Sequence, residues 1–326
     1  MAARDDIIAL GQRIGQSIIG QDTMVERLLL GLLANGHLLV EGLPGLAKTR
    51  AIKSLAKNLD SDLSRVQFTP DLLPADITGS EIYFSQGGKG EFKFQQGPIF
   101  ANLILADEIN RAPAKVQSAL LEGMEERQVT VGGKSYPLPE LFMVMATQNP
   151  IEQEGTYPLP EAQLDRFLMH IEVGYPDGTS EAAIMRLNRE EENAAHSDAK
   201  ASTPPTKLEP KAIFEARREI GVVTVSKPIE AYIVSLVLAT RYPNKYDKDL
   251  AKLVQVGVSP RGVIGLDKVS RSYAWLKGRD YVTPDDVKAV VNDVLRHRLI
   301  LSYEAHTSNA TPDQVIDRIV DLVAVA

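Results

Sequence analysis

Apolar residues in the first half of the chain follow two alternating spacings. Residues 21–34 carry apolar side chains three or four positions apart, which predicts an amphipathic helix that ends at Asn35-Gly36. Residues 38–40 form a short apolar run typical of a buried strand, and a helix is expected to begin at Lys48. Further strand-like runs lie at 63–68, 102–106, 141–146 and 167–173, with another helix expected at 113–126. Strands that alternate with helices predict a parallel sheet with helices on both faces.

Two segments interrupt this alternation and are predicted to form β-hairpins. Residues 81–95 place Gly87-Gly88 between two arms that contain aromatic side chains. Residues 128–138 are expected to turn at Gly132-Gly133. Paired glycines favour tight hairpin turns because glycine adopts positive φ without steric strain. Both segments are therefore expected to stand apart from the regular alternation of strands and helices.

The pattern changes after Pro176. Residues 178–192 have helical spacing and end in an acidic run, and a polar linker is expected at about 193–208. Beyond the linker helical patterns dominate. We therefore predict an α/β domain at residues 1–176, followed by a smaller all-helical domain at residues 177–326 that contains the linker.

Composition narrows the class of protein. The 326 residues are 44% hydrophobic and 24% charged, as in a globular protein of about two domains. The net charge of -7 argues against nucleic-acid binding, because phosphate backbones are bound by basic surfaces. The absence of cysteine excludes disulfides and thiolate chemistry, and the five histidines have no metal-binding spacing. Without a secretory signal or a run of about 18 apolar residues, we expect a soluble, cytoplasmic protein with no membrane span.

A loop typical of phosphate binding lies between the first predicted strand and the helix that follows it. Its residues are Gly42, Leu43, Pro44, Gly45, Leu46, Ala47, Lys48 and Thr49. Such a loop aims backbone N–H groups at a phosphate, while its lysine reaches the outer phosphates of ATP and its threonine ligates Mg²⁺. Ala47 replaces a glycine of the common pattern G-x-x-x-x-G-K-[ST]. Alanine is small enough for this position, provided that its φ is negative.

Two carboxylates end the strand predicted at 102–106. In nucleotide hydrolases with such a phosphate-binding loop, an aspartate at this place holds Mg²⁺, and Asp107 is the candidate. The adjacent Glu108 can take a proton from the attacking water as a general base. The sequence therefore predicts that the chain binds ATP with Mg²⁺ held by Thr49 and Asp107, and that Glu108 assists hydrolysis.

Four further polar residues have two interpretations each on local grounds. Asn149 either orients water near the phosphates or forms an Asn-Pro turn. Arg166 precedes an apolar run and Arg261 opens a helical pattern in the second domain, and each is either functional or a surface side chain in a salt bridge. Arg111 lies close to the acidic pair. It either meets the nucleotide of a neighbouring subunit or, as the sequence favours, forms a salt bridge within its own chain.

These motifs, in this order, resemble those of the AAA+ ATPases, and within them the MoxR family. The most specific string runs from Ala146 to Phe167. The resemblance also rests on Gly20-Gln21, on the phosphate-binding loop, on Asp-Glu-Ile-Asn-Arg-Ala-Pro from position 107, on Ser-Pro-Arg-Gly from position 259 and on Tyr-Val-Thr-Pro-Asp-Asp-Val from position 281. It covers residues 18–300 and makes alanine the normal residue at position 47.

The resemblance implies a role for each candidate residue. Asn149 corresponds to the sensor-1 residue, and Arg166 to an arginine finger that acts on ATP bound by the neighbouring subunit. Arg261 corresponds to the sensor-2 arginine, which reports the γ-phosphate from the helical lid. Ile19 and Gly20 correspond to residues that line the adenine pocket.

The resemblance also implies an architecture, an assembly and a function. The implied fold is an AAA+ P-loop α/β domain followed by an all-α lid, with the two hairpins directed at the ring pore or a ring face. Members of the family form hexameric rings, act as chaperone-like remodellers and often work with partners that carry von Willebrand factor A domains. A nucleic-acid-stimulated motor and a chelatase-like subunit for metal insertion are the alternatives. In the first hairpin Lys89 and Lys93 are balanced by Glu81 and Glu91, which favours a protein client over nucleic acid.

Overall fold

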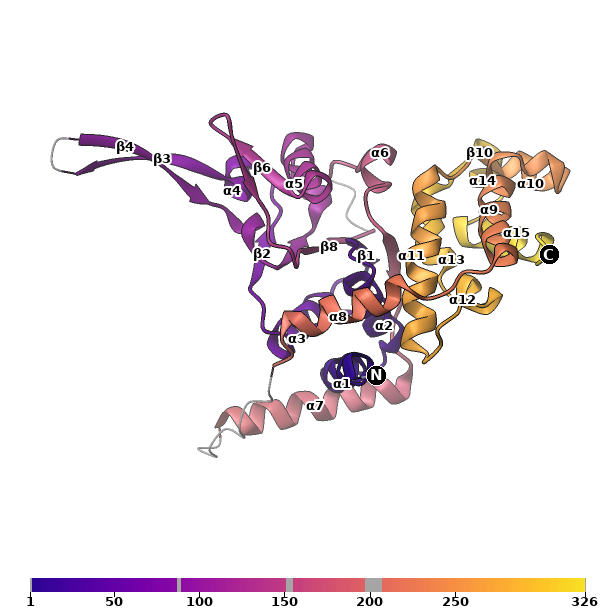
Figure 1. The fold of residues 1–326 in the computed structure, drawn as a ribbon, viewed down its shortest axis with the longest axis horizontal. Helices are drawn as coiled ribbons and strands as arrows, with labels where there is room; N and C mark the ends of the chain where they lie inside the picture. Colours follow the sequence, from indigo (N-terminus) through magenta and orange to yellow (C-terminus); the bar gives the residue numbers. More distant parts are fainter. Residues whose placement is uncertain (1, 87–88, 151–154, 197–206, 326) are drawn as a thin grey trace.

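A five-stranded sheet organises the first half of the chain in the computed structural model, which describes residues 2–86, 89–150, 155–196 and 207–325 (Figure 1). In spatial order the strands are β2 (Leu63–Gln67), β5 (Leu103–Asp107), β8 (Met143–Gln148), β1 (Leu38–Gly42) and β9 (Met169–Val173). Every neighbouring pair is parallel. The parallel sheet predicted from the sequence is therefore confirmed.

Helices cover both faces of this sheet because its strands are apolar on both sides. One face packs against α1 (Ala2–Ser17), α2 (Asp22–Leu33) and α3 (Lys48–Asn58), and the other packs against α5 (Ala114–Glu126). In β1, Leu38 and Val40 join the first hydrophobic cluster and Leu39 joins the second, as the alternation of a strand requires. Burial of each such side chain contributes about 1.5–3 kcal/mol. The strand that leads into the phosphate-binding loop is thus fixed between two hydrophobic layers.

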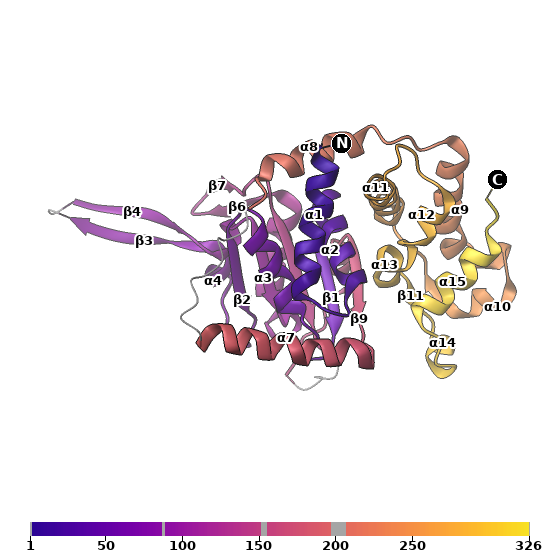
Figure 2. The same ribbon diagram turned by 90° about the horizontal axis from the view of Figure 1, so that it is seen from below.

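Both predicted hairpins are present. Strands β3 (Gly79–Gln86) and β4 (Lys89–Gln96) pair antiparallel and project away from the sheet (Figures 1 and 2). Their turn, predicted at Gly87-Gly88, lies outside the described residues. Strands β6 (Gln128–Val131) and β7 (Lys134–Pro137) form the second hairpin, and both glycines of its predicted turn have positive φ, 59° and 77°. Short elements complete this part: α4 (Pro74–Thr78), η1 (Pro98–Phe100), η2 (Ile109–Arg111) and α6 (Glu161–Leu164).

A second, mainly helical body lies at the opposite end of the molecule from the long hairpin (Figure 1). Its elements are α9 (Lys227–Arg241), η3 (Pro243–Lys245), α10 (Lys248–Leu253), α11 (Pro260–Leu276), α12 (Pro284–Lys288), α13 (Val291–Leu295), η4 (Arg296–Arg298), α14 (Tyr303–Thr307) and α15 (Pro312–Leu322). A small antiparallel ribbon of β10 (Val254–Val256) and β11 (Ile300–Leu301) lies among them. The predicted helical lid is confirmed. The ribbon was not predicted, because strands this short leave no periodic signal in the sequence.

Two helices within residues 177–326, the range predicted for the second domain, also contact the α/β unit. Helix α8 (Pro210–Gly221) packs beside α1 and α2, and the guanidinium of Arg217 donates to the carbonyl oxygen of Leu32 at 2.7 Å (Figure 2). Helix α7 (Gly178–His196) runs past the predicted start of the linker, so that start was placed too early; residues 197–206 lie outside the described ranges. The domain boundary at residue 176 stays a prediction. No described helix is long and apolar enough to cross a membrane.

A histidine is buried where α5 meets the sheet. His37 immediately precedes β1, and its Nδ1 accepts the N–H of Val144 at 3.0 Å, which leaves the proton on Nε2, 3.2 Å from the carbonyl oxygen of Met124. Burial, followed by the nearby charge of Arg127, lowers the pKa of His37 to about 3. The imidazole is therefore neutral in the folded chain at physiological pH, with both nitrogens engaged.

Acidification is expected to destabilise the fold through His37. Below its ordinary pKa of about 6.5 the unfolded chain binds a proton that the folded chain does not, so stability falls as pH decreases, until the pH nears the folded pKa of about 3. The loss is about 1.4 kcal/mol for each pH unit in that window. Urea unfolding between pH 7.5 and 5.5 measures it, with His37→Gln expected to reduce the dependence and the buried His297 to account for a remaining part. The exposed His306→Gln is the matched control; equal pH dependence in wild type and His37→Gln would contradict the interpretation.

Candidate active site

The predicted phosphate-binding loop and acidic pair line one cavity. The loop connects the end of β1 to the start of α3, and a cavity of about 350 Å³ lies beside it. The lining residues are Pro44, Gly45, Leu46, Ala47, Lys48, Thr49, Arg50, Asp107, Glu108, Thr147 and Asn149. The carboxyl ends of β1, β5 and β8 meet at this edge of the sheet, which is where ligands bind in parallel α/β folds. Residues predicted from three separate motifs are thus brought together.

The backbone of the loop differs from the prediction at Ala47. This residue precedes α3 with φ of 58° and ψ of 13°, so the condition of a negative φ, on which alanine was expected to fit, is not met. Gly45 also has positive φ, 86°. A left-handed alanine costs roughly 1–2 kcal/mol, and the adjoining helix holds it there. Ala47 offers no side-chain cap to α3, so the first N–H groups of that helix are not bonded by its capping residue and point toward the loop.

Lys48 lies where the loop joins the sheet. Its ammonium donates to the carbonyl oxygens of Gly42 and Gln148, the latter at 3.1 Å. Burial lowers the pKa of this lysine, and the charges of Asp107 and Glu108 act in the opposite direction. The field of the acidic pair therefore reaches the ammonium and keeps its charge favourable in a half-buried position.

Asp107 is held in a fixed orientation at the end of β5. Its Oδ1 accepts the hydroxyl of Thr147 at 2.7 Å, and its Oδ2 accepts the guanidinium of Arg65 at 2.7 Å. These two hydrogen bonds fix the orientation of the carboxylate. Asp107 and Thr49 line the same cavity, and an aspartate with a hydroxyl is an oxygen donor set that suits Mg²⁺ shared with phosphates and water. The residues present fit the predicted ion.

Glu108 is positioned by its own backbone and by two side chains. Its φ is 56°, a left-handed conformation that few non-glycine residues adopt, and such strain is frequent at functional sites. Gln67 donates to its Oε2 at 2.8 Å, and the guanidinium of Arg111 lies 3.0 Å from the same oxygen. The Glu108 N–H donates to the Thr147 hydroxyl at 2.9 Å. The salt bridge favoured for Arg111 is confirmed.

Three of these partners were not predicted. Arg65 and Gln67 come from β2, and Thr147 comes from β8. The strand pattern could have indicated these residues, because β2 and β8 flank β5 and the carboxyl ends of both strands lie beside the acidic pair. The Thr147 hydroxyl donates to one acidic residue and accepts from the backbone of the other, so it sets the orientation of both.

Asn149 follows β8 and is 7% exposed. It lines the cavity beside the phosphate-binding loop and also a neighbouring cavity of about 270 Å³ that includes Glu41. Its position near the acidic pair suits an amide that orients water. That role, implied by the family resemblance, stays a prediction.

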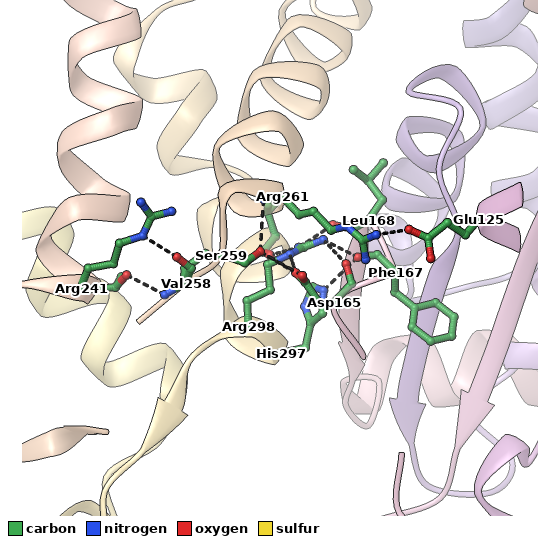
Figure 3. Close-up of polar contacts among 12 residues, drawn as sticks. Glu125, Asp165, Phe167, Leu168, Arg241, Val258, Ser259, Arg261, His297 and Arg298 are labelled. Carbon is green, nitrogen blue, oxygen red and sulfur yellow. Dashed lines mark hydrogen bonds and ion pairs between the residues drawn. The ribbon is translucent and has the colours of Figure 1, made fainter. Parts of the chain in front are cut away.

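The two candidate arginines meet at a different place. Arg166 and Arg261 line a cavity of about 320 Å³ between α5, α11 and the segment that precedes β9. The Arg166 Nε lies 2.8 Å from Glu125 Oε2. Arg261 pairs with the other oxygen of the same carboxylate (Figure 3). Neither arginine is among the residues that line the cavity beside the phosphate-binding loop. Arg261 of the lid therefore lies beside Arg166, the predicted arginine finger. Both lie outside the cavity beside the phosphate-binding loop of their own chain.

Ile19 and Gly20 lie at the turn between α1 and α2. Gly20 has φ of 76°, and a Cβ at this position would come within 2.7 Å of Ser180 at the start of α7. Gln21 donates to the carbonyl oxygen of Gly174 at 2.9 Å, so this turn is tied to the segment that leaves the sheet. The predicted adenine contact of Ile19 and Gly20 is not tested by this arrangement and stays a prediction.

Comparison with known proteins gives the same reading of both parts of the chain. The model of the "ATPase family associated with various cellular activities (AAA)" matches residues 37–169, and that of the "AAA lid domain" matches residues 248–319. The chaperone MoxR1 of Mycobacterium tuberculosis is 48% identical over 94% of this chain and 79% of its own length. The protein MoxR of Methylorubrum extorquens is 31% identical over 96% and 93% of the respective chains. A crystal structure from Cytophaga hutchinsonii, of a protein provisionally described as an ATPase, covers 100% of this chain and 96% of its own with TM-score 0.89 and 46% identity.

Proposed function

Because this chain belongs to the MoxR family of AAA+ ATPases, we propose that it hydrolyses ATP with Mg²⁺ in a hexameric ring and remodels a protein partner. One observation carries the proposal. The loop and the acidic pair line one cavity, whereas Arg166 and Arg261 line another. Each chain therefore offers half of a site to one neighbour and half to the other, and a closed ring of identical subunits completes every site.

Within one subunit the loop and the acidic pair bind ATP and activate water. The N–H groups at the start of α3 and the ammonium of Lys48 bind the phosphates, and Thr49 and Asp107 hold Mg²⁺. Mg²⁺ held by these residues would neutralise the charge that develops on the phosphate oxygens. Glu108 accepts the proton of the attacking water. Gln67 and Arg111 both contact its Oε2, so we assign the proton to Oε1.

The neighbouring subunit supplies the remaining positive charge. Arg166 reaches the γ-phosphate as an arginine finger, and Arg261, which shares the carboxylate of Glu125 with it, approaches from the same side. Both side chains are partly exposed, at 30% and 42%, so their ion pairs with Glu125 are weak enough to exchange for a phosphate. In this scheme hydrolysis depends on assembly.

ATP turnover per chain is therefore expected to rise steeply with protein concentration. Because the finger is worth about 10³–10⁵ in rate, dilute monomers should be nearly inactive and rings active, with Mg²⁺ required in both. Phosphate release across a dilution series, paired with sedimentation of the same samples, measures this. Lys48→Ala should be inactive at every concentration. Equal turnover per chain in monomers and rings would refute the shared site.

We further propose that the client is a protein and that the chain acts in the cytoplasm. The long hairpin presents three aromatic side chains to solvent: Tyr83 at 58%, Phe84 at 49% and Phe92 at 65% exposure. Lys93 on the same hairpin is paired with Glu91 at 3.5 Å, which leaves its surface without the excess of positive charge that nucleic acid requires. Exposed aromatic side chains bind apolar segments of a client. The relative MoxR1 is named a chaperone, which supports a protein client. A partner with a von Willebrand factor A domain fits the family resemblance.

A further inference from the structure

The segment that carries Arg166 is held by the lid as well as by its own α/β unit (Figure 3). Arg298, in η4, has only 3% of its side chain exposed and donates from all three guanidinium nitrogens. Its Nε bonds the carboxylate of Asp165 at 2.8 Å, and its Nη2 bonds the carbonyl oxygen of Phe167 at 2.6 Å. Its Nη1 bonds the carbonyl oxygen of Leu168 at 3.2 Å. The residues on either side of the predicted finger are thus fixed to one buried guanidinium.

Asp165 connects the finger segment to the start of α11 as well. The hydroxyl of Ser259 lies 3.0 Å and 2.9 Å from the two oxygens of this carboxylate, and it accepts the backbone N–H of Arg261 at 3.1 Å. With one proton to donate, the hydroxyl gives it to Asp165 and receives that of Arg261. A single carboxylate therefore links the backbones beside Arg166 and at Arg261.

The guanidinium groups of Arg166 and Arg261 are held less firmly than the backbones that carry them. The guanidinium groups share Glu125, which is 34% exposed, and such contacts exchange easily in water. The backbones are held by Arg298 and Asp165, whose side chains are largely buried. Burial lowers the pKa of Arg298 to about 10, so it remains charged at neutral pH. The guanidinium groups of Arg166 and Arg261 can exchange partners while the backbones that carry them stay fixed.

Other buried contacts dock the lid without this link. Arg296 donates to the carbonyl oxygen of His170 at 2.7 Å, and Arg27 of α2 donates to the carbonyl oxygen of Ala289 at 2.6 Å. Arg27 also pairs with Asp293 at 2.5 Å. The Ser259 hydroxyl is therefore not required to keep the lid attached. Its effect on the two arginines can be separated from lid docking.

We propose that Asp165, together with Ser259 and Arg298, fixes the backbones of Arg166 and Arg261 relative to each other, so that the lid of each subunit positions the arginines offered to its neighbour. The inference rests on the proposed hydrolysis across subunits. It assigns positioning roles to three residues that touch no nucleotide. Catalytic geometry is sensitive to such roles, since a displacement of about 1 Å can reduce a rate about a hundredfold.

Subunit mixing tests this. A donor chain with Glu108→Gln offers its arginines but cannot hydrolyse, and an acceptor chain with Arg166→Ala hydrolyses only with a donor's help. Turnover in the mixture therefore reports the donor's arginines alone. With Ser259→Ala added to the donor, we expect kcat of the mixture to fall about tenfold, with KM for ATP unchanged because the acceptor's loop binds the nucleotide. Ser302→Ala in the donor is the matched control, since Ser302 also caps a lid helix but lies away from Asp165.

Each outcome of the mixing experiment is informative. A mixture of donor and acceptor that shows no turnover would overturn the proposed function and the inference with it. Restored turnover that is equal for Ser259→Ala and Ser302→Ala donors would overturn the inference alone. So would equal losses with Ser259→Ala in the donor or in the acceptor, because general destabilisation has no preferred side. Arg298→Ala, which leaves Asp165 without its buried partner, is the severe variant and should exceed the effect of Ser259→Ala if it folds.

Discussion

Arg166→Ala is expected to abolish ATP turnover while leaving ATP binding intact. The side chain is remote from the loop of its own chain and meets only Glu125 among the charged partners described for it. Its removal therefore leaves the phosphate-binding residues in place. Under the proposed function, it also removes a charge that stabilises the transition state in the neighbouring site, an effect of about 10³–10⁵ in rate. Steady-state phosphate release and titration with a fluorescent ATP analogue measure the two effects.

The stability of this variant should be close to that of the wild type, because partly exposed ion pairs contribute about 0–1 kcal/mol. Arg218→Ala, which removes an exposed arginine from α8, is the matched control and should turn over normally. The finger assignment is wrong if Arg166→Ala hydrolyses ATP at the wild-type rate in samples that form rings. Loss of ATP binding in the variant would point instead to a role within its own subunit.

Glu108→Gln is expected to hold ATP without hydrolysing it. The amide has nearly the shape of the carboxylate, so the left-handed backbone and the contact with Gln67 can be kept. It cannot accept the proton of water, and loss of a positioned general base reduces a rate about 10²–10⁴-fold. Retention of labelled ATP by assembled rings, followed over hours, measures the trap.

Glu122→Gln is the matched control for the trap, since Glu122 is exposed on α5 and lies outside the candidate site. It should hydrolyse and release nucleotide as the wild type does. Normal turnover in Glu108→Gln would show that another group accepts the proton. A pull-down with the trapped ring would then serve a second purpose, because a client held by the ATP state can be identified from it.

The sequence predicts that the loop and the acidic pair lie together, because the determinants of their positions are local. Gly42 and Lys48 lie at the junction of one strand with one helix, and Asp107 and Glu108 lie at the end of another strand. Parallel strands bring their carboxyl ends to one edge, so proximity follows from the strand order alone. Thr147 could have been placed by the same reasoning, since it precedes Gln148 at the end of β8.

The meeting of Arg166 and Arg261 at Glu125 could not be predicted, because it depends on how the lid packs. Arg166 and Arg261 are far apart in sequence, and their common partner Glu125 lies at the end of α5, where it resembles a solvated surface residue. Only the docked lid brings the three together. Ala47 illustrates a different limit: its small side chain was recognised, but the sign of its φ depends on the turn into α3. Residue type narrows φ without fixing it.

The position of β1 has a consequence for synthesis of the chain. This strand lies between β8 and β9 in the sheet, although roughly a hundred residues or more separate it from either in sequence. At about 5–20 residues per second on the ribosome, its apolar residues are made roughly 5–20 s before either neighbouring strand exists. During that interval Leu38, Leu39 and Val40 have no sheet to join. The strand that leads into the nucleotide site is therefore an early product of translation but a late member of the folded sheet.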